Sequence, residues 1–84
     1  MSSIERLLER MRRSKTGWTC EDLEKLYLGL GFEKQEGGKH TIYVHPKFSE
    51  LRATITRSRS LAIGYIIHAI RLADMLKEKE SKNE

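Results

Sequence analysis

One stretch decides the fold: Gly37-Gly38-Lys39-His40-Thr41-Ile42-Tyr43-Val44-His45-Pro46. Its glycines predict a tight turn that opens directly into a strand, and His40 is the first residue of that strand. Aliphatic side chains at 42 and 44 alternate with polar and aromatic ones, a period of two that is typical of a half-buried strand. The proline at the end has no backbone N–H to donate, so we expect strand pairing to stop there.

Two helices are expected before this stretch. Apolar residues recur at helical spacing between residues 4 and 11, which predicts an amphipathic helix over residues 3–14, capped by Ser2 or Ser3. Thr19 can begin a second helix, because acidic residues follow it in the first turn. That helix should end near Gly29, and an extended segment leads from there into the glycine turn.

One more strand and one more helix are expected after the stretch. Apolar and polar residues alternate over residues 51–56, and Ser58 or Ser60 can cap a helix over residues 60–78. The apolar residues of this last helix cover more than one stripe, so the sheet alone cannot bury them. Either the N-terminal helix or a second subunit must cover the remainder, which makes a homodimer through the C-terminal helix one possibility.

The pattern therefore predicts an α+β fold. A three-stranded antiparallel sheet with helices packed on one face, in the order α-β-β-β-α, is expected over residues 18–78. An extra helix within residues 1–17 precedes it, and residues 79–84 are expected to form a polar tail. The opposite face of the sheet is left open.

Length and composition restrict the class of protein. The chain has 84 residues, 38% hydrophobic and 33% charged, which suits one small globular domain. No apolar run approaches the roughly 18 residues of a membrane span, and the N-terminus lacks the apolar core of a secretory signal. A single cysteine, Cys20, cannot form an internal disulfide. A cytoplasmic protein without membrane contact is the simplest interpretation.

The formal net charge is +4, and the positive charge is uneven along the chain. Two arginine-rich segments flank a mildly acidic middle, which suits an anionic partner such as RNA; a solvated surface with excess arginine is the alternative. Candidate phosphate contacts are Arg12, Arg13, Arg57 and Arg59.

Several short motifs, in this order and spacing, resemble the HicA family of small bacterial toxins. Gly31-Phe32 matches the helix exit of that family, Gly38-Lys39-His40 its glycine-x-histidine turn, Tyr43 its aromatic residue and His45-Pro46 its His-Pro. The resemblance covers about Trp18 to Ile70. It implies a fold like the double-stranded-RNA-binding domain, mRNA interferase activity and an antitoxin partner of the HicB type. The chain departs from the family pattern in having Lys39 where Ser or Thr is common, a longer closing helix and an added N-terminal helix.

His40 is the candidate catalytic residue. RNA cleavage without a metal needs a group that takes the 2′-OH proton and groups that offset charge growing on the phosphate. A histidine exchanges protons near neutral pH, Lys39 can neutralise phosphate, and Gly37 and Gly38 allow close approach of a backbone. No cofactor is expected, and no metal, because the cysteine and histidines lack ligand spacing.

The other histidines have structural interpretations. Five strand steps place His45 about 16 Å from His40 and on the opposite face, so the two cannot act on one phosphodiester. We expect His45 to hydrogen-bond the following loop and His68 to be a packed or interface residue. Tyr43 should also face away from His40 and serve in packing.

Three hypotheses remain open from the sequence. The first is a ribonuclease of the HicA type, and the second is a non-catalytic module of the same fold that binds RNA. The third is a protein-interaction domain that uses the spare face of the last helix, which is compatible with either of the others.

Overall fold

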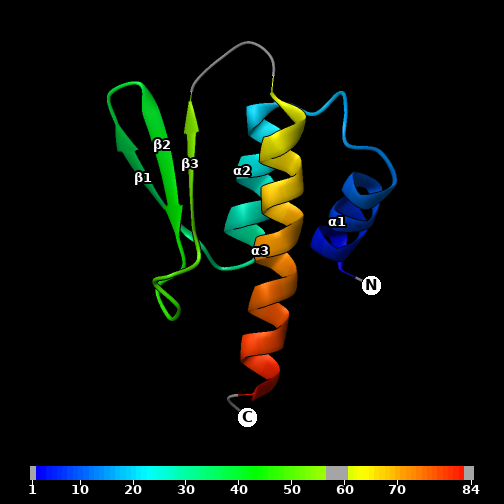
Figure 1. The fold of residues 1–84 in the computed structure, drawn as a ribbon, viewed down its shortest axis with the longest axis vertical. Helices are drawn as coiled ribbons and strands as arrows, with labels where there is room; N and C mark the ends of the chain where they lie inside the picture. The colour runs from blue at the N-terminus through cyan, green and yellow to red at the C-terminus, as the bar shows by residue number, and fades with distance from the viewer. Residues whose placement is uncertain (1, 57–60, 83–84) are drawn as a thin grey trace.

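Three helices and three strands follow one another in the predicted α+β order. The computed structural model describes residues 2–56 and 61–82. The elements are α1 (Ser3–Arg13), α2 (Cys20–Gly29), β1 (Glu33–Gly37), β2 (His40–Val44), β3 (Arg52–Thr56) and α3 (Ile63–Lys82). Figure 1 shows the sheet on one side, α2 and α3 packed against it, and α1 beyond these two helices.

The sheet is the predicted antiparallel meander, with strand order β1-β2-β3. Gly37 pairs with His40, so the connection is a two-residue turn of Gly38 and Lys39, and Gly37 belongs to β1 rather than to the turn. Gly38 has a φ of 55°, a left-handed conformation that favours glycine. On the other side of β2, His40 pairs with Thr56.

Only one face of the sheet is covered by helices. Tyr43, Ala53 and Ile55 are buried between the sheet and the helices, with 3–4% of their surface exposed. Residues of the opposite parity, Ile42 and Val44, are only partly buried and lie on the open face. In β2, the side chain that packs under the helices is therefore the aromatic Tyr43, and the aliphatic Ile42 and Val44 point to the open face.

α1 covers the outer side of α2 and α3. Leu7 and Met11 of α1 are buried in the core, and Met11 is fully inaccessible. Ile4 packs on the backbone of Gly29, where a Cβ would come within 2.3 Å of its side chain. α1 thus covers part of the apolar surface which the sheet cannot reach, while Ile63, Ile67 and Met75 of α3 stay 37–48% exposed.

Both N-terminal helices begin at the predicted caps. The side chain of Ser2 accepts a hydrogen bond from the backbone N–H of Glu5 at 3.2 Å. Thr19 and Asp22 form a capping box, in which each side chain accepts from the other residue's backbone N–H. These local bonds fix where α1 and α2 start.

The prediction of a polar tail from residue 79 was wrong for residues 79–82, because α3 continues as a helix to Lys82. Lys79 forms an ion pair with Glu50 at 2.6 Å, and its ammonium lies 5.8 Å from the centre of the Phe48 ring. Lys82 also pairs with Glu78 one turn earlier, at 3.2 Å. The start of α3 is at Ile63, and the predicted serine caps at 58 and 60 lie outside the described residues.

Neither α3 nor the shorter helices, as far as the structure describes them, combine the length and apolar character that crossing a bilayer requires.

Replacing Gly29 with alanine tests how closely α1 approaches α2. The added methyl group would collide with Ile4, so we expect Gly29→Ala to lower the free energy of unfolding by about 1–3 kcal/mol. Gly64→Ala is the matched control: outside its own helical turn and chain neighbours, no described atom lies within 4 Å of its Cβ position, and helical alanine should stabilise by about 0.4–1 kcal/mol. Urea unfolding of both variants measures the difference, and equal stability of the two would contradict this packing.

The Arg12–Asp74 pair joins α1 to α3 through two hydrogen bonds, one of them 3.2 Å long. Hydrogen bonding from Arg12 lowers the pKa of Asp74, so the pair stabilises the fold above the ordinary carboxyl pKa and loses its effect as pH falls through the lowered value. Both side chains are partly exposed, so Asp74→Asn should cost only about 0.5–1 kcal/mol at pH 7. Thermal unfolding between about pH 7 and pH 2 should show this difference vanish in acid.

Glu80→Gln removes the same charge from the same helix and is the control for that experiment. Glu80 is exposed and has no ion pair among the described residues. If the loss of thermal stability in Asp74→Asn does not change with pH, or if Glu80→Gln loses as much stability, the Arg12–Asp74 pair does not anchor α1.

Candidate functional site

His40 is exposed at the hairpin end of the open sheet face. The backbone N–H of His45 donates to the carbonyl of Leu51 at 3.1 Å, which fixes the alternation of hydrogen-bonded pairs between β2 and β3. By this alternation His40 and Thr56 form a non-hydrogen-bonded pair, the type that brings opposite side chains closest together. His40 therefore lies opposite Thr56, whose hydroxyl accepts a hydrogen bond from the phenol of Tyr65 at 3.4 Å, and none of the described helices covers this face.

Among the described residues, the cross-strand neighbours of His40 on the open face are neutral. The next cross-strand row is Gln35, Ile42 and Thr54, and Arg52 is one row further. Lys39 in the turn is exposed and has no ion pair among the described residues. Gly37 and His40 thus close the hairpin as the last residue of β1 and the first residue of β2, and Gly38 and Lys39 form the exposed turn between them.

Lys34, a second cation near the hairpin, already has its charge offset by two carboxylates. Lys34 projects from the helix-covered face of β1 and pairs with Glu24 of α2 and with Glu36 at 3.0 Å. Hydrogen bonding to these carboxylates raises the pKa of Lys34. Lys34 therefore serves β1–α2 packing and leaves Lys39 as the cation of the turn.

His45 is a structural residue, which confirms the sequence interpretation. It is 7% exposed, and its Nδ1 accepts a hydrogen bond from the backbone N–H of Lys47 at 3.1 Å. Its ring lies between the rings of Phe32 and Phe48, with centroid distances of 5.2 and 5.3 Å. Gly31 has a φ of 96°, a left-handed conformation that favours glycine, and a Cβ there would lie 3.4 Å from the Nε2 of His45, an ordinary van der Waals contact.

Tyr43 and His68 also have structural roles. Tyr43 stacks on Tyr27 with 4.8 Å between ring centroids, and burial raises the pKa of both phenols. His68 is exposed rather than packed inside, and its Nε2 lies 3.1 Å from the carbonyl oxygen of Arg52 at the outer edge of β3. Neither side chain shares the face on which His40 lies.

Of the four arginines proposed from the sequence, the two that the structure describes, Arg12 and Arg13, do not join His40. Arg12 and Arg13 belong to α1, which lies beyond α2 and α3 from the sheet (Figure 1), and Arg12 is committed to Asp74. Arg57 and Arg59 lie outside the described residues. The RNA contacts predicted for these four positions stay predictions.

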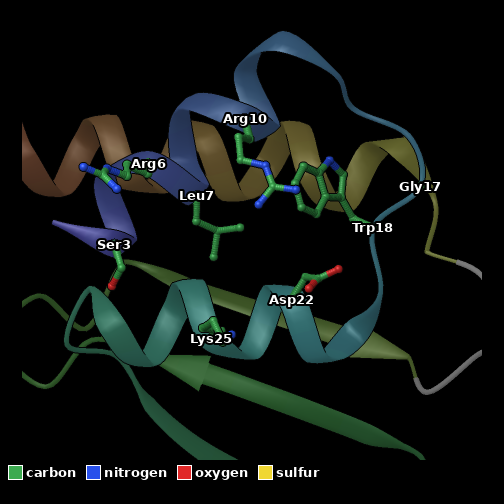
Figure 2. A pocket seen from close by; sticks show the side chains of 8 residues that line it. All are labelled: Ser3, Arg6, Leu7, Arg10, Gly17, Trp18, Asp22 and Lys25. Carbon is green, nitrogen blue, oxygen red and sulfur yellow. The ribbon is translucent and has the colours of Figure 1, made fainter. Parts of the chain in front are cut away.

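A second cluster, which the sequence reasoning missed, lies between α1 and α2 (Figure 2). A hollow of about 460 Å³ is lined by Arg6, Arg10 and Lys25, together with Trp18. The guanidinium of Arg10 lies 5.3 Å from the centre of the Trp18 ring. The helical spacing of the arginines was visible in the sequence, but nothing local placed Trp18 beside them.

Within residues 2–56 and 61–82, no three histidine, cysteine or carboxylate side chains are gathered as a metal site would need. Comparison with protein-family models, with curated proteins and with solved structures finds no match to this chain. Function must therefore be inferred from the residues and their geometry.

Proposed function

We propose that this chain is a metal-independent endoribonuclease of the HicA type that acts on mRNA, with His40 as general acid and base. An antitoxin protein of the HicB type would neutralise it. The observation that carries the proposal is the exposed imidazole of His40, beside a glycine turn and on the sheet face that no helix covers.

The reaction would proceed by proton exchange at one ring. His40 takes the proton of a ribose 2′-OH, the 2′-oxygen attacks the adjacent phosphorus, and the bond from phosphorus to the 5′-oxygen breaks. The imidazolium, or water, then gives a proton to the departing 5′-oxygen, and a 2′,3′-cyclic phosphate remains. Every atom stays within the RNA, and only a proton passes through the protein.

Lys39 and Gly38 would assist at the phosphate. Lys39 is exposed next to His40, so its ammonium can offset charge that develops on the phosphate oxygens. Gly38 has no side chain to hold an approaching backbone away, and a Cβ there would meet no atom of the described residues within 4 Å beyond its chain neighbours. The open face leaves a strand of RNA room to lie across β2.

A non-catalytic RNA-binding module is the second candidate, because His40 lacks a partner that could share the proton transfers. Its cross-strand neighbours are Gly37 and Thr56, and among the described residues no carboxylate or second imidazole shares this end of the open face. Salt-sensitive binding without cleavage would select this candidate over the first.

His40→Ala should abolish RNA cleavage, with a loss of about 10²-fold or more, and leave the thermal midpoint nearly unchanged because the ring is exposed. His68→Ala is the matched control, since His68 is also exposed but contacts only the β3 edge. Gel analysis of a labelled RNA, with the cyclic phosphate identified at the cut ends, measures the effect. Cleavage by His40→Ala at the parental rate would overturn the assignment.

Lys39→Ala should weaken RNA binding and reduce the slope of log affinity against log salt by about 0.7, because one phosphate contact is lost. Lys82→Ala removes a similar charge at the distant end of α3 and should leave the slope unchanged. Filter binding between about 50 and 200 mM salt provides the data. If the parent chain fails to bind RNA even at the lowest salt, both candidate functions are eliminated.

A further inference from the structure

The hollow between α1 and α2 adjoins a second one. The first, about 460 Å³, and the second, about 370 Å³, share Arg10, Gly17 and Trp18 in their linings. Figure 2 shows the guanidinium of Arg10 beside the indole of Trp18 at the first hollow. Because the two hollows share these lining residues, they adjoin one another along α1, and we call them together the depression.

Three arginines follow this depression. Arg6, Arg10 and Arg13 are spaced i, i+4 and i+7, so they lie on one side of α1, at steps of about 6 and 4.5 Å along the helix axis. Arg6 lines the first hollow, Arg13 the second and Arg10 both. Lys25 faces the first hollow from α2. We call these four residues the basic stripe.

The charge of the basic stripe is not used within the fold. None of its members forms an ion pair with a carboxylate of the described residues, whereas Arg12, Lys34 and Lys79 all do. The acid that lines the depression, Asp22, accepts hydrogen bonds from the backbone and hydroxyl of Thr19, both at 3.0 Å. Net positive charge therefore faces solvent along the depression.

The side chain of Arg10 is positioned by its contact with Trp18. The indole N–H of Trp18 donates to the carbonyl of Ser14 at 2.7 Å, which fixes the ring, and the guanidinium of Arg10 stacks over that ring. A stacked guanidinium keeps its N–H edges free for bidentate contacts to phosphate and loses little further entropy on binding. The half-buried indole also leaves aromatic surface on which a base can stack.

We propose that the basic stripe and Trp18 bind the sugar-phosphate backbone of a single-stranded nucleic acid. A linear row of arginines over two adjoining hollows suits a linear polyanion better than a single small phosphate, and the indole suits a base better than an acidic peptide. The site lies beyond α2 and α3 from His40 and needs no ribose hydroxyl. It goes beyond the proposed cleavage and does not depend on it.

Trp18 is the single tryptophan of the chain, so its fluorescence reports occupancy of this site directly. The experiment titrates the full chain with oligodeoxythymidylate of about 12 nucleotides, which lacks the 2′-OH and cannot be cleaved at His40. We expect saturable quenching, with log affinity falling against log salt by about 0.7 for each phosphate held. The same titration of His40→Ala should be unchanged.

The double variant Arg6→Gln with Arg13→Gln should bind at least about tenfold more weakly at low salt and lower the salt slope by about 1.4. Arg71→Gln with Lys82→Gln removes the same charge from the exposed side of α3 and should bind like the parent. Circular dichroism of all variants verifies folding, and the residues changed are exposed.

Three results would overturn the proposal. They are an absent Trp18 response, equal losses in the two double variants, and binding of oligoglutamate in place of the oligonucleotide, which would assign the basic stripe to an acidic protein segment. Loss of cleavage in His40→Ala bears only on the nuclease proposal, so the two ideas fail separately.

Discussion

The stacking of Tyr43 on Tyr27 is the contact on which the rest of the structure depends. The two rings lie 4.8 Å apart between the sheet and α2, and each is at most 3% exposed. Successive side chains of a strand point to opposite faces, so burying this tyrosine turns the even-numbered residues of β2 outward. The position of His40 on the open face is a consequence of that burial.

The motifs that resemble the HicA family separate physically into two groups. Phe32 and His45 pack together at the end of the sheet away from the hairpin, next to Gly31, whose positive φ favours glycine. The glycine turn and His40 remain exposed at the hairpin end. One group of motif residues thus holds β2 against α2, and the other leaves an imidazole exposed to solvent.

α1 adds a third layer to the fold and carries a positively charged surface apart from the hairpin that bears Lys39. Its apolar side closes the core over α2 and α3, while Arg12 anchors it to Asp74. Its remaining arginines face outward beside Trp18. One side of α1 therefore buries apolar surface of the core, and its other side carries arginines that form no ion pair with a carboxylate of the described residues.

The sequence by itself determined whatever depends on neighbours within a few residues. The start of α2 at Thr19, the presence of a glycine hairpin and the order of the elements all rest on short-range bonds and periodicity, although Gly37 pairs in β1 instead of joining the turn. Periodicity shows that a strand has two faces but does not show which face is buried. In β2 the buried face is that of Tyr43, and Ile42 lies on the open face. Only the tertiary structure decided that choice, the extension of α3 through Lys79 and the meeting of Arg10 with Trp18, because each requires surfaces brought together by folding.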